Sequence, residues 1–354
     1  MKKYLIFIFM FLFLCGCGKT TNEDIVKKFK DKIEKNNSYT LKGTMTILSN
    51  EDTFSYDVEA SKSKDDYYKI SLINKTNNHE QVILKNSDGV YVITPDLNKS
   101  FKFQSDWPNN GSQSYLLDIL VKDVENDKEL HIETNEDKII QCKVNYPNNK
   151  NLYSEKIYLD KDYGVSKVEV LDQDGKVKIT LEVKVIDYKP KFNDNFFALD
   201  SYITETEEIE KDNNKKDENQ TEDNIENKEE TTENTSNMLD DIVYPLYVPT
   251  NTHLSTEDTI NTDNGTRAIL TFAGEKPFIL VEEVSKRYED LEIIPINGDP
   301  LMMADSIGAI SANSLYWTSD GIDYYISSTS LDGSELMTIA EGLTGTSVIV
   351  SSEK

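Results

Sequence analysis

The chain of 354 residues carries 64 acidic residues against 38 lysines and arginines, which gives a formal net charge of −26. So acidic a protein does not bind nucleic acid by neutralising phosphates, which requires a basic face, and it is not drawn flat onto anionic lipids. Hydrophobic residues make up only 37% of the chain, yet 19 tyrosines and 13 phenylalanines can build cores, so we expect the polar excess to be concentrated in one stretch.

The N-terminus resembles the signal peptide of a bacterial lipoprotein. Two lysines precede an apolar run over residues 4 to 14, which is too short to cross a bilayer because that takes about 20 residues. Leu14, Gly16 and Cys17 then match the −3, −1 and +1 positions of a lipobox. Cys15 fits less well, since Leu14 would be a bulky residue at −1. We expect cleavage after Gly16.

Cleavage there makes residues 1–16 the signal peptide and residues 17–21 a lipidated tether. A diacylglycerol on Cys17, with a further acyl chain such as palmitate, would anchor the protein to the extracytoplasmic face of the membrane without spanning it. The alternative is an uncleaved signal peptide that happens to end in cysteine. The excess of lysine, asparagine and isoleucine over arginine and alanine resembles proteins of low-GC Gram-positive bacteria (Firmicutes). Apart from this covalent lipid, we expect no cofactor.

The first domain is predicted over residues 22–203. It opens with a helix over residues 24 to 35, capped by Asn22, in which Ile25, Phe29 and Ile33 form one stripe. A second helix is predicted over residues 113 to 125.

Outside these two helices the apolar residues alternate with a period of two, which is typical of strands. The predicted strands cover residues 39–47, 54–60, 68–72, 82–84, 91–93, 129–133, 138–146, 154–159, 165–171 and 178–188. Short turns containing Asp and Gly join them, which favours antiparallel hairpins. The sum is an α+β domain in which two helices cover one large antiparallel sheet.

This order of elements resembles the LolA-like family of lipoprotein carriers. Its Gram-positive relatives include sporulation and germination lipoproteins of the YdcC and GerS type. The residues that carry the likeness are Ile-Tyr-Leu-Asp-Lys-Asp-Tyr-Gly at 157–164, Lys-Val-Glu-Val at 167–170 and Asp-Gly at 174–175. The likeness covers nearly all of residues 22–200.

The resemblance implies an incomplete barrel whose concave apolar face is plugged by helices. In Gram-negative members of the family this cavity holds the acyl chains of travelling lipoproteins. Leu41, Met45, Phe54 and Tyr56 are the residues expected to line such a hydrophobic ligand face. The alternative is that the two helices fill that face as an ordinary core. A tethered relative also resembles a receptor, sensor or adaptor more than a soluble shuttle.

Residues 204–238 contain 13 acidic residues, 4 lysines and 7 asparagines, and almost nothing apolar. Such a segment cannot bury enough apolar surface to offset its ordering entropy, so we predict a disordered acidic linker. An arm that buffers calcium or spans the cell wall is the alternative.

The second domain is predicted over residues 239–354 as a smaller α+β unit. Strands are expected at 267–272, 277–284, 307–312 and in a hairpin at 315–326, followed by a helix over 334–343. The Tyr-Val-Pro start, the Leu-Tyr-Trp-Thr-Ser-Asp-Gly hairpin and the Leu-x-x-Ile-Ala helix resemble a C-terminal domain of unknown function. That domain recurs in Firmicute lipoproteins and membrane-anchored regulators, and it implies no chemistry.

The residue types that carry catalysis form no recognisable set. His79, His131 and His253 lack metal-ligand spacing, and no nucleophile elbow, phosphate loop or dinucleotide motif is present. Cys142 alternates with apolar residues in a predicted strand, so a buried structural thiol is favoured over a nucleophile. We therefore predict no catalytic residues, no metal site and no enzyme activity.

Three weaker alternatives stay open. A hydrolase dyad could be hidden among the many carboxylates, although a raised-pKa acid needs a desolvated setting. Calcium could bind Asp-Gln-Asp-Gly at 172–175, but the remaining ligands of a calcium loop are missing. Trp107 and Trp317 could form a sugar platform, but core or interface anchors are favoured.

The leading hypothesis is a non-enzymatic extracytoplasmic lipoprotein that acts as a binding module or adaptor at the cell envelope in sporulation or germination. Its partners would be the membrane, through the anchor, and an envelope protein such as a cell-wall enzyme. The alternative is a lipid or lipoprotein carrier with an acyl-chain ligand, and a cell-wall hydrolase is the least favoured reading. Exposed sheet edges would favour a protein partner, and a deep pocket would favour lipid.

Overall fold

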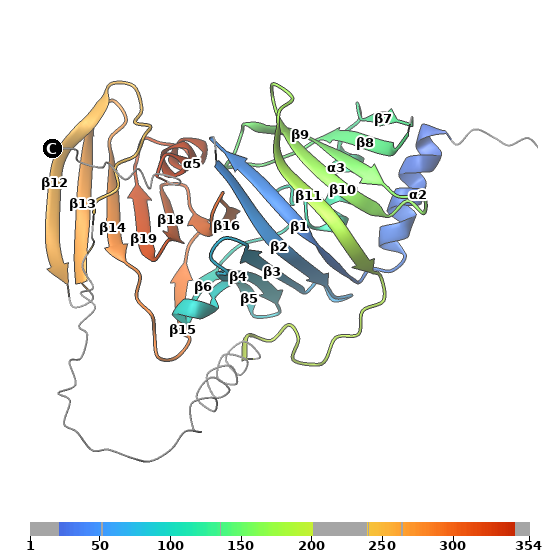
Figure 1. Ribbon diagram of the computed structural model, residues 1–354, viewed down its shortest axis with the longest axis horizontal. Helices are drawn as coiled ribbons and strands as arrows, with labels where there is room; N and C mark the ends of the chain where they lie inside the picture. Colours follow the sequence, from blue (N-terminus) through green and yellow to red (C-terminus); the bar gives the residue numbers. More distant parts are fainter. Residues whose placement is uncertain are drawn as a thin grey trace, which may run out of the picture.

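The computed structural model describes residues 21–50, 52–134, 136–200, 239, 241–262 and 265–343. Over these ranges the chain forms two large sheets with few helices, which confirms the predicted α+β class (Figure 1). Gly16, Cys17 and the predicted linker lie outside the described residues. None of the described helices is both long and apolar enough for a membrane crossing.

The first domain contains most of the larger sheet and the helices that cover it. Its elements are α2 (Asn22–Glu34), β1 (Tyr39–Ser49), β2 (Asp52–Lys62), β3 (Tyr68–Asn74), β4 (Glu80–Asn86), β5 (Gly89–Thr94), the 3₁₀ turn η1 (Pro95–Leu97), β6 (Lys99–Phe103), α3 (Leu117–Asn126), β7 (His131–Glu133), β8 (Lys138–Lys143), β9 (Leu152–Leu159), β10 (Val165–Asp172) and β11 (Val177–Asp187). All the strands predicted for this domain are present, with shifted ends, and β6 is an additional strand.

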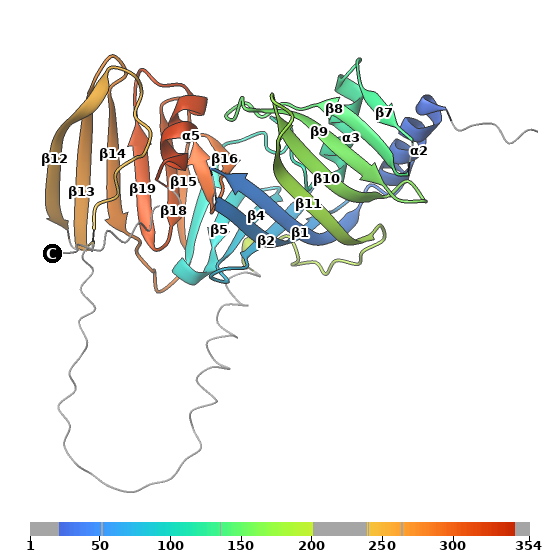
Figure 2. The same cartoon turned by 45° about the horizontal axis from the view of Figure 1, so that its top comes forward.

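The larger sheet has twelve strands in the order β15-β6-β5-β4-β3-β2-β1-β11-β10-β9-β8-β7. Neighbouring strands are antiparallel except for β15 (Glu292–Ile296), which comes from the second domain and runs parallel to β6. The sheet curves but its two end strands do not pair, so it is not closed into a barrel (Figure 2). The predicted incomplete barrel is therefore correct.

The concave side of this sheet is filled by α2 and α3. Ile25, Phe29 and Ile33 of α2 are 5% exposed or less, and they share one core with Leu117 and Leu120 of α3 and with the inward residues of the strands. Burying each large apolar side chain stabilises the fold by about 1.5–3 kcal/mol. The helices thus make the concave face a packed core.

Thr21, not the predicted Asn22, is the N-cap of α2. The Thr21 hydroxyl accepts the Asp24 N–H at 3.2 Å, and the Asp24 carboxylate accepts the Thr21 N–H at 3.2 Å. This reciprocal capping box needs an acid three residues after the cap. If Asn22 were the cap, the residue three positions later would be Ile25, whose side chain cannot accept a hydrogen bond. The cap is therefore Thr21, one residue before the predicted one.

The second helix begins later than predicted. Residues 113 to 116 precede α3, and Leu116 has extended backbone at the N-cap position. The Leu116 N–H donates to the Gln113 carbonyl in a turn, so the chain before the helix is a loop. Residues of this loop reach the domain junction described below.

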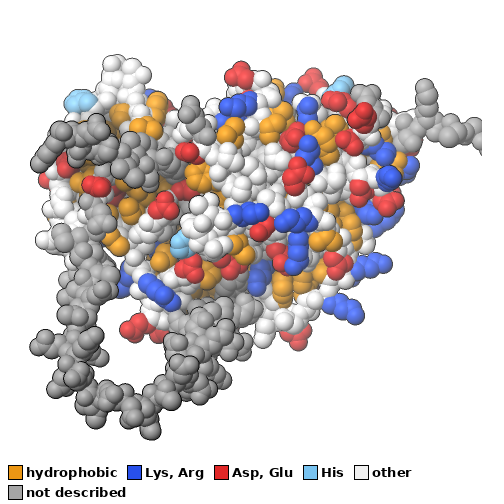
Figure 3. Space-filling view, in the orientation of Figure 1, with side chains coloured by type: hydrophobic (Ala, Val, Ile, Leu, Met, Phe, Trp, Pro, Cys, Tyr) orange, Lys and Arg blue, Asp and Glu red, His pale blue; other side chains and the backbone are white. Residues whose placement is uncertain are grey.

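The outer face of the larger sheet carries alternating charges. Lys42 pairs with Glu59 at 2.7 Å across β1 and β2, and Lys184 of β11 pairs with Asp57 at 3.0 Å. Figure 3 shows lysines and acidic side chains interspersed over these strands. Exposed pairs of this kind contribute at most about 1 kcal/mol each, and they give this face no basic stripe for nucleic acid.

A second apolar cluster covers the opposite side of β4 and β5. The segment after β11 packs Phe192, Phe196 and Phe197 against one another and onto the strands, with ring centroids 4.7–4.9 Å apart. Both faces of these strands are therefore buried, as the apolar run Val-Tyr-Val-Ile at 90–93 requires.

The second domain is a seven-stranded sheet with one helix. Its elements are β12 (Thr252–Thr262), β13 (Gly265–Gly274), β14 (Phe278–Val284), β15, β16 (Asp299–Met302), β17 (Ile307–Ile310), β18 (Ser314–Ser319), β19 (Ile322–Ser327) and α5 (Gly333–Glu341), and the sheet order is β12-β13-β14-β19-β18-β17-β16. Leu336, Ile339 and Ala340 of α5 pack on one face of this sheet, as their spacing predicts. The strands β12, β15 and β16 were not predicted.

The two domains share a buried contact. Ala304, Ile307 and Ala309 of the second domain belong to the core cluster of the first. The Lys99 ammonium of β6 pairs with the Asp323 carboxylate of β19 at 2.7 Å, and these side chains are only 3% and 9% exposed. The two domains, which residues 204–238 separate in the sequence, therefore pack against each other in the structure.

Lys99 and Asp323 neutralise each other away from water. Burial raises the pKa of Asp323, but the Lys99 charge and hydrogen bonds from Lys99, Ser285 and Thr318 outweigh it, so the pKa lies below its usual value. Removing one partner leaves the other charge buried without compensation, which is costly.

We therefore expect Asp323→Asn to lower the free energy of unfolding by about 3 kcal/mol. Denaturant unfolding of the protein at pH 7 measures this. Lys150→Met is the matched control, because Lys150 pairs with Asp332 at 2.8 Å but both side chains are more than half exposed. Its loss should be under about 1 kcal/mol. Equal losses in both variants would contradict a special role for the buried pair.

Candidate functional site

The described structure has a cavity of about 340 Å³ where the two domains meet. Its walls come from the end of β1, the loop before α3, the turn between β8 and β9, and the start of β11. The second domain closes it with β16, the residues after β16, and α5. This volume is at the lower end of the range of about 300–1,000 Å³ for ligand sites in proteins.

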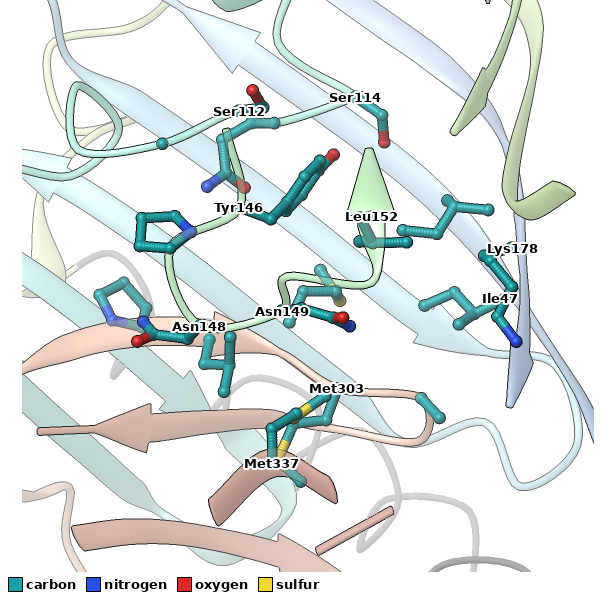
Figure 4. A pocket seen from close by; sticks show the side chains of 18 of the residues that line it. Ile47, Ser112, Ser114, Tyr146, Asn148, Asn149, Leu152, Lys178, Met303 and Met337 are labelled. Atoms are coloured by element: carbon teal, nitrogen blue, oxygen red, sulfur yellow. The ribbon is translucent and has the colours of Figure 1, made fainter. Parts of the chain in front are cut away.

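Methionine is prominent in the apolar part of the lining, beside leucine and isoleucine. Met45, Met302, Met303 and Met337 all line the cavity, and they are all the methionines that the described ranges contain. Ile47 and Leu152 lie beside them, and Figure 4 shows Met303 and Met337 next to each other across from Ile47. Methionine is flexible and polarisable, so such a surface adapts to different apolar ligands.

Polar groups form the remaining lining. Amides of Asn148 and Asn149 and hydroxyls of Ser112 and Ser114 come from the two loops, with the Tyr146 ring between them (Figure 4). These groups can orient a ligand by hydrogen bonds while the methionines hold its apolar part.

Three charged residues also line the cavity: Lys178, Asp299 and Glu341. Burial raises the pKa of Glu341, and the Lys178 charge partly opposes that shift. Lys178 comes from β11 of the first domain, whereas Asp299 of β16 and Glu341 of α5 come from the second. A ligand would therefore meet both domains at once.

Several contacts hold the domains together around the cavity. The Tyr56 hydroxyl donates to the Ala304 carbonyl at 2.8 Å, and the Ile307 N–H donates to the Gln81 side-chain oxygen at 2.7 Å. The Asn50 amide donates to the Glu341 carbonyl at 3.2 Å. Since these bonds cross the junction, the shape of the cavity depends on the docking of the domains.

The structure places the predicted ligand-face residues mainly in the core. Leu41, Met45 and Tyr56 are 4% exposed or less, and Phe54 is partly buried against the same core. Met45 lines the cavity, and the other three do not. The sequence analysis did not predict that the loops at 110–115 and 146–149 and the methionines of the second domain line one cavity. No local sequence pattern shows that these distant segments meet.

A pair of buried carboxyls lies behind the polar wall. Glu155 of β9 is fully buried and Asp123 of α3 is 8% exposed, and one oxygen of each has no hydrogen-bond partner among the described residues. Burial, reinforced by the Asp123 charge, raises the pKa of Glu155 well above its usual value. Burial also raises the pKa of Asp123, to about 6. Such a pair is stable when at least one of the two carboxyls is protonated.

The buried pair makes the stability depend on pH. An acid whose pKa is raised on folding favours the folded state below its unfolded value of about 4, and this contribution is lost as the pH rises through the folded pKa. We expect the free energy of unfolding to fall by about 1–3 kcal/mol between pH 5 and pH 8.

The variant Glu155→Gln tests this, because an amide cannot ionise. It should be more stable than the unaltered protein at pH 8 and should reduce the pH dependence, as measured by denaturant unfolding. Glu136→Gln, at an exposed carboxylate, is the control and should leave the pH dependence unchanged. A Glu155→Gln profile parallel to that of the unaltered protein would contradict a raised pKa of Glu155 as the source of the pH dependence.

The residues weighed for catalysis are scattered. His79, His131 and His253 are exposed and far apart in the fold, and His79 bonds Asp96 at 2.7 Å. Cys142 is buried as predicted, and burial raises the pKa of its thiol, followed by the charge of Glu155, so a reactive thiolate is disfavoured. Among the described residues no cluster of His, Cys, Asp and Glu could hold a metal ion. Trp107 and Trp317 are 1% exposed and belong to cores, which excludes a sugar platform.

The chain is thus an α+β protein with an open sheet and a cavity between its two domains that four methionines help to line. The sequence is 35% identical to the sporulation protein YdcC of Bacillus subtilis strain 168, over 93% of this chain and 92% of that protein. The chain therefore belongs to the YdcC family of sporulation proteins. A scan against protein-family models finds no match.

Solved structures of low sequence identity are also similar to the chain. A LolA superfamily protein from Nitrosomonas europaea is 10% identical, with a TM-score of 0.31 over 52% of this chain and all of that one. The MucA/MucB complex of Pseudomonas aeruginosa contains a chain that is 11% identical, with a TM-score of 0.31 over 88% of this chain and 95% of that one.

Proposed function

We propose that this protein is a non-enzymatic adaptor of sporulation, anchored by lipid on Cys17 to the extracytoplasmic face of the membrane, that binds another envelope protein. Kinship with a sporulation protein over nearly the whole chain supports the process. The lipobox-like sequence ending at Cys17 supports the location. A part in spore germination is the finer variant of the same proposal.

The observation that carries the proposal is the cavity with every described methionine on its wall. An apolar side chain of a partner, inserted there, would touch both domains and be fully desolvated, as binding hot spots are. The amides and hydroxyls around it suit the backbone of a polypeptide. The described residues offer no nucleophile or metal set that would favour a hydrolase.

The cavity also supports a second candidate, a carrier of acyl chains. Its methionines and its volume would suit the end of an acyl chain, although the concave face expected to hold such chains is filled by α2 and α3. The carrier would then use the domain junction in place of the interior of the sheet.

Native mass spectrometry on the chain from Lys19 onward, purified gently from sporulating cells, separates the two candidates. The adaptor predicts a complex with a second polypeptide. Leu301→Trp, which fills the cavity from β16, should weaken this complex about tenfold or more. Val185→Trp, on the outer face of β11 where the side chain is 53% exposed, is the control and should not weaken it.

A bound acyl species that Leu301→Trp removes would contradict the adaptor and establish the carrier. If both Leu301→Trp and Val185→Trp still bind, the ligand lies outside the cavity. Methionine-methyl NMR locates the contact, because the four cavity methionines should shift while Met238 of the acidic segment stays unchanged as an internal reference.

A further inference from the structure

The two sheets have four edges, and one of them differs from the others. The edge strands β7, β15 and β16 have three, five and four residues, and Pro295 and Pro300 interrupt the latter two. The fourth edge strand, β12, has eleven residues and contains neither proline nor lysine. Proteins protect edge strands by shortness, proline, charged side chains and bulges. The strand β12 is neither short nor interrupted by proline, so its protection rests on one bulge and two adjacent carboxylates.

Among the described residues, no strand pairs with the outer side of β12. It pairs with β13 along its whole length, with one bulge between Leu254 and Thr256, and residues 253–261 are all exposed. Apart from this ladder, no hydrogen bond among the described residues uses the backbone groups of 253–261. An antiparallel neighbour on one side leaves about half of a strand's N–H and C=O groups pointing outward. These groups form a template for one further strand.

The charges at the middle of β12 restrict what can pair there. Glu257 and Asp258 are its central residues, and the strand contains neither lysine nor arginine. Successive residues of a strand point to opposite faces, so the two carboxylates lie on different faces of the sheet. The Tyr244 hydroxyl donates to Glu257 at 2.6 Å and holds that carboxylate in place.

A second copy of this chain is a poor occupant of the edge. Antiparallel pairing of two β12 strands about their common midpoint would set Glu257 opposite Glu257, and like charges directly opposite each other destabilise a sheet. A strand with two successive basic residues matches instead, because it presents one cation to each face. The net charge of −26 also draws a basic partner.

Apolar residues flank the acidic centre on the face opposite α5. Asp258, Ile269, Val281 and Tyr325 stand in one row across β12, β13, β14 and β19. Ile260, two residues along from Asp258 on the same face, is 42% exposed. An added strand would cover Ile260 with an apolar residue two positions from its own cation.

We propose that β12 is a strand-addition surface for an extended segment of a partner protein, with two adjacent basic residues opposite Glu257 and Asp258. Main-chain hydrogen bonds would supply affinity, and the two cations and their flanking apolar residues would supply register and specificity. This site is separate from the cavity, so a partner could use either without the other.

The probe is a blocked synthetic peptide, Thr-Thr-Val-Lys-Lys-Val-Thr-Thr, added to the chain from Lys19 onward. Hydrogen exchange should show new protection of amides within 253–261 and none at β16. E257K/D258K should weaken binding about tenfold or more, since two attractive cross-strand pairs become repulsive. E136K/D137K changes the net charge equally at an exposed turn and should have less than about a twofold effect at 0.15 M salt.

A control peptide has the same composition, but one residue separates its two lysines. Both cations then lie on one face of the added strand, so this peptide should bind more weakly than the probe. Equal loss in the two charge-reversed variants would overturn the proposal in favour of non-specific attraction. The amides of 253–261 that bond β13 are protected in any case, so the test uses those that point away from β13. Their protection without peptide would overturn the proposal: if it rises with protein concentration a second copy covers the edge, and otherwise the chain itself does. No added protection of these amides at saturating peptide would also overturn it.

Discussion

The arrangement of the whole molecule depends on how one lysine is buried. Lys99 lies at the start of β6, where its ammonium is withdrawn from water and balanced by Asp323 of the second domain. A buried charge is tolerated only when it is paired and hydrogen-bonded, so the edge of the first sheet is complete only with the second domain in place. The parallel pairing of β15 with β6 completes the same edge through backbone hydrogen bonds.

This docking creates the candidate site. Met45 and Ile47 of β1 line the cavity together with residues of β16 and α5. The junction encloses them and leaves a space that is apolar enough to attract a ligand and flexible enough to adapt to it. A chain with two independent domains on a linker would not bring the four methionines into one cavity. Ligand binding in the cavity and docking of the domains are therefore linked, because a ligand there would contact both domains.

The sequence predicted the local structure and not the junction. Alternation of apolar residues located ten strands of the first domain, and the spacing of Leu336 and Ile339 located α5, because these signals arise within one element. The strand β6 carries Lys99 and Ser100 at fully buried positions, which reads as a polar loop until its partner is known. That partner is 224 positions away, beyond any local pattern. The four cavity methionines likewise come from distant segments, so the predicted ligand face was assigned to the interior of the sheet, which the helices fill.

Hydrogen exchange of the unliganded chain from Lys19 onward tests directly whether the two domains form one body. If they do, the amides of β6 and β15 are protected to a degree similar to those of β1 in the middle of the larger sheet, and Asp323→Asn lowers the protection of β15 first. If the amides of β15 exchange within seconds while those of β1 stay protected, the domains are separate in solution. The cavity would then not exist without a ligand, and the account given for it would be contradicted.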